Sequence, residues 1–319
     1  MNSYFLKSLV LCLLFPLSTL AQESIDESRT VASNERISIE VISGKVSIRG
    51  TQDNVFRVRG MLAEDAEGYI LESNNGFTRF EVEMPRRGFW NQRSRRDSDE
   101  SELEIEVPMG AAIEFAGVNI DINVTEIHGS SDITTVNGDI YANNLSNIVS
   151  LSTVNGKIEN RNSDGRIKLA SVNGEIFDED SEGRIEFTTV NGEVVSASRA
   201  QEVSIETVNG EAELDLVGTE VLEMSTVNGD IDVRLAGSFS PRIEGSTVSG
   251  DLNLIIEGEI SAHFSINAHA GGDIENLFSD DRATRDQFGP RKQLNFKTKD
   301  AQGSINLTTV SGDIEIDDL

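Results

Sequence analysis

The stretch Ile185-Glu186-Phe187-Thr188-Thr189-Val190-Asn191-Gly192-Glu193-Val194 decides the fold of this chain. Its central tetrad, Thr-Val-Asn-Gly, recurs along the sequence, with Ser replacing Thr in one copy. The tetrads end at Gly138, Gly156, Gly174, Gly192, Gly210 and Gly229, so the first five glycines keep a constant 18-residue period and the sixth follows one position later than that period requires. Weaker Thr-Val-Ser-Gly copies end at Gly250 and Gly312. A short, fixed period indicates one small unit stacked repeatedly on itself.

Within each unit, apolar and polar residues alternate over two short segments, as expected for two short β-strands. Ile185, Phe187 and Thr189 share one face, Val190-Asn191-Gly192 forms a corner, and Val194 resumes the alternation. Ser-Asp-Gly and Ser-Glu-Gly at 163–165 and 181–183 mark a second turn. Helical periodicity is absent, so the sequence predicts an all-β protein.

Two arrangements fit these strands. Asn-Gly favours a two-residue hairpin and hence an antiparallel meander. Alternatively, each unit is one coil of a parallel β-solenoid, stacked at ~4.8 Å per coil. A meander would leave one apolar face uncovered, whereas a solenoid buries its own faces. We therefore predict a parallel β-solenoid (single-stranded β-helix) of 18-residue coils with a less regular β N-terminal part. Val190 is expected to be buried at the corner, so Val190→Asp would bury an unpaired charge.

Residues 1–21 have the pattern of a secretory signal peptide. Lys7 supplies a positive charge, Leu9 to Leu20 is apolar, and Thr19-Leu20-Ala21 is a small-residue cleavage site before Gln22. Cys12, the single cysteine, lies in this segment. We expect an exported protein that is either periplasmic or extracellular at the cell surface, and that has no disulfide bonds.

The remaining sequence divides into a flexible linker at 22–35 and one β-solenoid domain at 36–319. The domain is expected to be less regular over 36–110, with an Arg-rich loop at 85–102, and regular over 111–257. Irregular coils with an insertion are predicted over 258–319. Gly272 and Gly312 are 40 residues apart, which predicts about two coils plus a small insertion, with the break in the pattern at about 278–292.

The composition is strongly acidic, with 27 Lys and Arg against 55 Asp and Glu, a net charge of −28. Nucleic-acid binding depends on many cationic phosphate contacts, so this composition excludes it. After the signal segment the chain has no further long apolar run, so we predict no transmembrane segment in the mature chain.

The repeats predict two polar columns along one corner of the stack. The asparagines would form a hydrogen-bonded ladder, and each following glycine would supply a positive φ. The ladder residues are Asn137, Asn155, Asn173, Asn191, Asn209 and Asn228. The residue after the glycine is usually acidic: Asp139, Glu175, Glu193, Glu211, Asp230, Asp251, Asp273 and Asp313, with Lys157 as the exception. We predict a solvated acidic edge and no cofactor, calcium being the alternative.

The segment at 86–96 is rich in arginine, although the chain as a whole is acidic. Its candidate ligand- or partner-binding residues are Arg86, Arg87, Trp90, Arg93, Arg95 and Arg96. Arginines beside an aromatic ring suit an anionic glycan, a lipid phosphate or an acidic envelope protein. The alternative is a solvated loop neutralised by the acidic residues at 97–102.

Catalysis has little support in the sequence. His128, His263 and His269 are the three histidines, and no nucleophile elbow, metal-spaced cluster or phosphate loop occurs. We predict a non-catalytic cell-envelope or surface protein that binds a partner or glycan. The alternatives are a purely structural envelope protein and a carbohydrate-active β-helix enzyme, a polysaccharide lyase or hydrolase. In the enzyme, Arg166, Lys168 and Arg184 would act with neighbouring carboxylates.

Three sequence features together resemble a bacterial cell-envelope family usually called "putative adhesin", a domain of unknown function with a β-helix fold. They are Val-Ile-Ser-Gly-Lys-Val at 41–46, Leu-Glu-Ile-Glu-Val-Pro at 103–108 followed by Gly110, and the Thr-Val-Asn-Gly-Asp-Ile units. The resemblance covers 36–319 and implies a β-helix with an adhesive role at the cell envelope. It transfers no catalytic or ligand residue to this chain.

Overall fold

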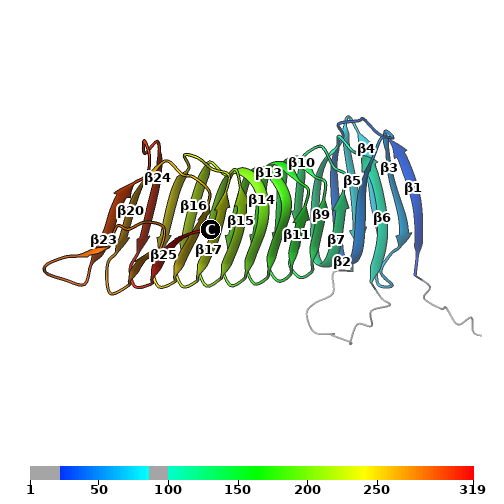
Figure 1. Ribbon diagram of the computed structural model, residues 1–319. Coiled ribbons are helices and arrows are strands. Elements are labelled where there is room, and N and C mark those ends of the chain that lie inside the picture. The colour runs from blue at the N-terminus through cyan, green and yellow to red at the C-terminus, as the bar shows by residue number, and fades with distance from the viewer. Residues whose placement is uncertain (1–21, 86–99) are drawn as a thin grey trace, which may run out of the picture.

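A computed structural model describes residues 22–85 and 100–319, and these residues form strands and no helix (Figure 1). The prediction of an all-β protein is therefore confirmed for the described part of the chain. Within those two ranges no helix is long and apolar enough to cross a membrane.

The repeats build two rows of strands, which we call row 1 and row 2. Row 1 holds the strand before each Val-Asn-Gly or Val-Ser-Gly corner: β8 (Ser131–Thr134), β10 (Ser146–Thr153), β12 (Asp164–Ser171), β16 (Val221–Thr226) and β18 (Arg242–Thr247). Row 2 holds the strand after it: β9 (Ile140–Asn143), β11 (Ile158–Arg161), β15 (Ala212–Val217), β17 (Ile231–Ala236) and β19 (Leu252–Glu257). The long strands β13 (Ile176–Thr189) and β14 (Val194–Glu206) begin in row 2 and end in row 1.

Neighbouring repeats pair in parallel and in register. Ile158 of β11 lies opposite Ile176 of β13, and Leu169 of β12 lies opposite Phe187 of β13, in each case one repeat period further along the chain. The strands that flank each Asn-Gly corner do not pair with each other as a hairpin, so the antiparallel meander does not describe these repeats.

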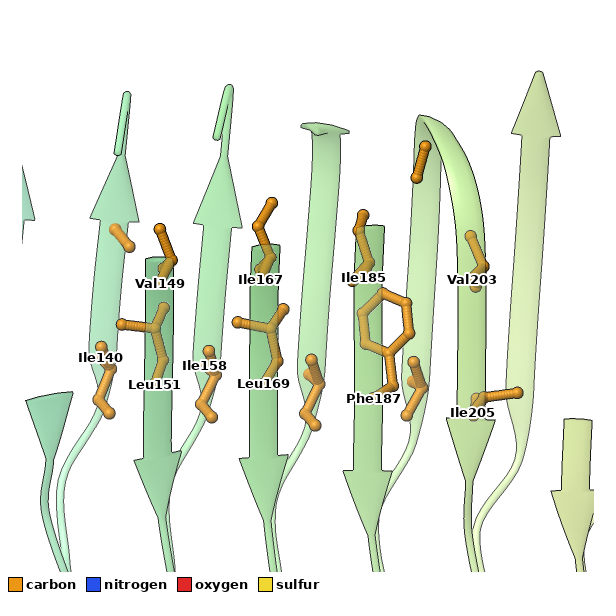
Figure 2. Close-up of a cluster of buried hydrophobic side chains, with 14 of the residues drawn as sticks. Ile140, Val149, Leu151, Ile158, Ile167, Leu169, Ile185, Phe187, Val203 and Ile205 are labelled. Carbon is orange, nitrogen blue, oxygen red and sulfur yellow. The ribbon is translucent and has the colours of Figure 1, made fainter. Parts of the chain in front are cut away.

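The core lies between the two rows (Figure 2). Leu151, Leu169 and Phe187 point inward from row 1 toward Ile140 and Ile158 of row 2, and all five are buried completely. The alternation of apolar and polar residues in each strand produces this burial, because successive side chains point to opposite faces.

The corner residues differ from two sequence expectations. Thr189 is buried but Val190 is 36% exposed, so the prediction that Val190→Asp buries a charge is wrong. Of the six glycines that end Asn-Gly tetrads, only Gly138 has a positive φ. The glycines are needed for a different reason: a Cβ on Gly192 would lie 2.1 Å from the carbonyl oxygen of Gly174 in the preceding repeat.

The N-terminal end is closed by antiparallel strands. β2 (Arg36–Thr51) pairs in parallel with β7 (Ala112–Thr125) on one side and with β5 (Phe77–Glu83) and β6 (Ser101–Pro108) on the other. β4 (Gly68–Asn74) then pairs antiparallel with β5, and β3 (Val55–Met61) with β6. The expected flexible linker at 22–35 is wrong, because it contains β1 (Ser24–Thr30), which pairs antiparallel with β3 and buries Ile25.

At the C-terminal end the chain order differs from the spatial order. The strands are β20 (Ala262–Ala268), β21 (Ile274–Asn276), β22 (Thr284–Arg285), β23 (Lys292–Lys297), β24 (Gly303–Thr309) and β25 (Ile314–Asp318). β24 lies between β18 and β20, and β25 lies between β19 and β21. Gly272 lies directly beside Gly312, so the prediction that about two coils separate them is wrong. Figure 1 shows β23 and β20 outside β24.

Candidate functional site

A groove of about 390 Å³ lies on the outer surface of row 2, near the N-terminal end. Five neighbouring strands, in the spatial order β3, β6, β2, β7 and β9, form it. Its lining includes Lys45, Ser47, Arg59, Met61, Glu102, Glu104, Asp121, Asn123 and Tyr141. Because these residues belong to paired strands rather than loops, the groove has a rigid backbone.

The hollow results from a difference in side-chain size across the sheet. Ser47 of β2 and Asn123 of β7 are register neighbours that point outward at the middle of the groove. Tyr141 of β9 is the register neighbour of Asn123 on one side, and Glu104 of β6 is the neighbour of Ser47 on the other. Small polar side chains therefore form the floor, and larger ones form the two rims.

Tyr141 is the aromatic residue of the groove, and its side chain is 40% exposed. Its hydroxyl donates a hydrogen bond of 3.2 Å to Asp139 Oδ2. Desolvation by burial and the adjacent Asp139 carboxylate raise the pKa of Tyr141 above its ordinary value. The phenol therefore stays protonated at neutral pH, and its ring lies at the rim of the groove.

The groove contains charged side chains of both signs. Lys45 lies between Glu102 and Asp121 in the strand register, and Arg59 lies opposite Glu104. Arg59 Nε also contacts Asp26 Oδ1 at 3.2 Å. With two cationic and three anionic side chains in its lining, the groove has no positive excess that would attract an anion.

A second hollow, of about 380 Å³, lies on the outer surface of row 1. Its lining includes Glu206, Glu223 and Glu244, with serines, Asn306 and Thr308, and contains neither an aromatic ring nor a cation. We therefore place the candidate site in the groove of row 2, where an aromatic ring and both signs of charge come together.

The asparagines form a continuous hydrogen-bonded column along the corner. Asn191 Nδ2 donates to Asn173 Oδ1 at 2.9 Å, and Asn209 Nδ2 donates to Asn191 Oδ1 at the same distance. The same bond joins Asn137, Asn155, Asn173 and Asn228 to their preceding rungs. Asn119 also belongs to this column, because it accepts the hydrogen bond of Asn137. Its place was not predicted from the sequence, since Ile rather than Gly follows it. The side-chain amides bond mainly to one another, which gives this column a structural role.

The acidic column is partly satisfied by backbone groups. The Asp139 carboxylate accepts a hydrogen bond of 2.8 Å from the Lys157 backbone N–H, and the Asp230 carboxylate accepts one of 2.8 Å from Asp251. The same contact joins Asp251 to Asp313 and Asp313 to Asp273. Among residues 22–85 and 100–319, no group of three or more His, Cys, Asp or Glu side chains is placed to hold a metal ion.

Of the other residues predicted from the sequence, Arg166, Lys168 and Arg184 do not line the groove. The candidate binding residues Arg86, Arg87, Trp90, Arg93, Arg95 and Arg96 lie outside the described residues. Lys168 pairs with Glu186, and Arg184 pairs with Glu202, both on the exposed side of row 1. Arg166 is exposed beside Arg184 in the register. Lys168 and Arg184 therefore form ordinary ion pairs between repeats.

The chain matches one protein-family model over most of its length. Residues 34–317 match the model of the family described as Toastrack DUF4097. No curated protein sequence matches this chain.

Three solved structures are similar at low identity. A "putative cell adhesion protein" from Clostridium sporogenes is 12% identical, with a TM-score of 0.23, and the match covers 93% of this chain and 100% of that one. "Putative adhesin" structures from Bacteroides fragilis and Parabacteroides distasonis are 11% and 10% identical, with TM-scores of 0.36 and 0.39. Both matches cover 93% of this chain and 98% of the other.

Proposed function

This chain belongs to the Toastrack DUF4097 family, and we propose that it is an exported, non-catalytic cell-envelope protein that binds a saccharide in the groove of row 2. The observation that carries this proposal is the combination of Tyr141 with the polar floor of Ser47 and Asn123. Export is supported by the secretory pattern of residues 1–21.

The chemistry of the groove favours sugar rings. A pyranose presents an apolar face that packs on an aromatic ring and a rim of hydroxyls that exchange hydrogen bonds. Tyr141 supplies the ring, while the Ser47 hydroxyl and the Asn123 amide supply donors and acceptors. Because the lining has no positive excess to attract an anion, we propose a neutral saccharide rather than the anionic glycan expected from the Arg-rich segment.

The proposal takes the repeats as coils of a parallel β-solenoid. The parallel register between successive repeats and the inward-facing side chains of the two rows support this architecture. Such a stack presents a long, rigid outer surface, and a polymer that contacts several adjacent coils would gain affinity without ordering a loop.

The Arg-rich segment remains a separate prediction of a site for an acidic partner. A carbohydrate-active enzyme is the weaker alternative, since Lys168 and Arg184 are already paired with carboxylates of the next repeat. Replacing Arg166, Lys168 or Arg184 should therefore leave saccharide binding in the groove unchanged.

The test is calorimetric titration of the exported chain with a panel of neutral oligosaccharides chosen by glycan-array screening. Tyr141→Ala should weaken binding of any sugar identified roughly tenfold or more, because stacking is lost. Tyr141→Phe removes the hydrogen bond to Asp139 but keeps the ring, so it should retain most of the affinity.

Phe239→Ala is the matched control, because Phe239 is an aromatic residue that is 50% exposed and lies outside the groove. Phe239→Ala should bind the identified sugar with the affinity of the wild type. If no neutral sugar binds, or if Tyr141→Ala and Phe239→Ala bind equally well, the groove is not the saccharide site.

A further inference from the structure

The C-terminal strand pair occupies a slot whose two walls both precede it in the sequence. β18 and β19 form one wall, while β20 and β21 form the other. β23 pairs antiparallel with the far edge of β20 and supports the second wall. Both walls of the slot that β24 and β25 occupy therefore consist of residues that precede position 298.

The slot is specific for this strand pair. Ile305 and Leu307 of β24 and Ile314 and Ile316 of β25 are buried completely. Each strand also pairs along both of its edges; for example, Ile305 lies between Ile243 and Phe264. Without the strand pair, four unpaired strand edges and an apolar interior would be open to another chain.

The connection into the slot carries backbone strain. Residues 298–302 join β23 to β24, and Lys299 and Ala301 adopt φ values of 49° and 51°. Left-handed conformations are unfavourable for residues other than glycine. The Ala301 backbone N–H donates to the Thr298 carbonyl oxygen at 3.0 Å, so this hinge is a tight turn. Tight, strained hinges favour exchange of the segment that follows them, because the hinge can extend in the exchanged form.

We propose that the slot is also a binding site for β24 and β25 of a second copy of this chain, which yields a dimer by reciprocal exchange of the C-terminal strand pair. Every contact within the slot is then preserved, with the strand pair supplied by the other copy, and only the hinge changes conformation. The inference depends on strand register and is independent of saccharide binding.

The primary test uses two single-cysteine variants in a Cys12→Ser background. Asn253 of β19 and Glu315 of β25 are register neighbours on the outer side of row 2. Parallel neighbours have a Cα separation that a disulfide can bridge. After Asn253→Cys and Glu315→Cys chains are unfolded, mixed at high concentration and refolded, exchange predicts a disulfide-linked dimer that contains one chain of each kind.

Two controls make the result interpretable. The variant with both cysteines should form an internal disulfide when refolded at low concentration, which checks the geometry of the pair. Either single variant refolded alone should give much less linked dimer, because position 253 of one copy faces position 315 of the other in the exchanged form.

Variants of the hinge provide an independent readout. Ala301→Gly relieves the left-handed strain and should lower the dimer fraction several-fold at a given concentration. Ala301→Val increases the strain and should raise it. Both changes leave the slot itself intact, and size-exclusion chromatography with circular dichroism checks that the monomer folds.

If the internal disulfide forms but no mixed linked dimer appears with the wild-type hinge, with Ala301→Gly or with Ala301→Val, the slot accepts only its own strand pair and the proposal is wrong. A dimer whose fraction is the same in all three hinge backgrounds and that never links position 253 to position 315 would also overturn it.

Discussion

Asp178 places a carboxyl group in the core, between the polar register neighbours Asn160 and Ser196 of the adjacent repeats. Its carboxylate accepts hydrogen bonds from Asn160 Nδ2 at 2.7 Å, Ser181 Oγ at 2.6 Å and Ser196 Oγ at 3.2 Å. Ser163 Oγ donates to Asn160 Oδ1 at 2.7 Å and completes the cluster. Burial raises the pKa of Asp178 above its ordinary value, although these hydrogen bonds act in the opposite direction.

Asp178→Asn should therefore stabilise the protein at neutral pH. A raised pKa in the folded state means that the stability contributed by Asp178 is full below the unfolded pKa and is lost as the pH rises through the folded pKa. Asparagine stays neutral and keeps the same shape. The free energy of unfolding should rise by about 1–3 kcal/mol at neutral pH, and the difference from wild type should shrink near pH ~4. Urea unfolding at several pH values measures this difference in the free energy of unfolding between Asp178→Asn and the wild type.

Asp180→Asn is the control, because it removes the same charge from a nearby exposed position that pairs with Arg199. Asp180→Asn should show no comparable pH-dependent gain in the free energy of unfolding. If Asp178→Asn destabilises the protein equally at both pH values, the hydrogen bonds of the carboxylate outweigh its burial.

At the scale of the repeat, the corner glycines set how closely successive turns of the chain approach. A Cβ on Gly174, Gly192 or Gly210 would lie 1.9–2.1 Å from the carbonyl oxygen of the preceding corner glycine. No side-chain rotation relieves such a contact, since both atoms belong to the backbone region. A larger residue at these corners therefore requires neighbouring repeats to move apart.

Gly192→Ala should lower the free energy of unfolding by about 2–4 kcal/mol, because two repeats must separate to admit the methyl group. Gly218→Asn is the matched control: Gly218 has a φ of 77°, but nothing lies within 4 Å of its Cβ position. Asparagine tolerates the left-handed region, so this change should cost under about 1 kcal/mol. Equal urea midpoints for the two variants would contradict the close-approach explanation.

The sequence predicted the repeat well because its period fixes which residues share a column. The alternation around Phe187 places its side chain inward, and the 18-residue spacing aligns Asn173 with Asn191. It failed where pairing depends on residues far apart in the chain. Nothing in the local pattern of Gly312 shows that its repeat lies beside Gly250 rather than beyond Gly272. β1 was missed because charges alternate around its single deeply buried residue, Ile25.

The groove could not be predicted for a related reason. Ser47, Asn123 and Tyr141 lie in three separate segments, and each is an ordinary outward-facing residue of its own strand. Only the order of the strands makes them neighbours, and only their difference in size makes a hollow. The Asn column, by contrast, was visible because every rung has the same sequence signature.

At the scale of the whole molecule, the chain has a net charge of −28, and part of its acidic charge lies in a single column along the elongated stack. Glu175, Glu193 and Glu211 occupy equivalent exposed positions in three consecutive repeats. Two unit charges one strand spacing apart in water repel by ~0.8 kcal/mol. Folding fixes these carboxylates close together, so the column opposes stability, most strongly when little salt screens it.

Glu193→Lys should therefore raise the melting temperature by several degrees in low salt, because one change replaces two repulsions with two attractions. The gain should fall as salt rises above ~0.1 M, where the screening length is about 10 Å. Glu67→Lys changes the net charge by the same amount at an exposed position outside the column, so it should give a smaller gain. Melting curves over a salt series distinguish the two. Equal gains from Glu193→Lys and Glu67→Lys would show that the overall charge, rather than the alignment of carboxylates along the repeats, limits the stability of the fold.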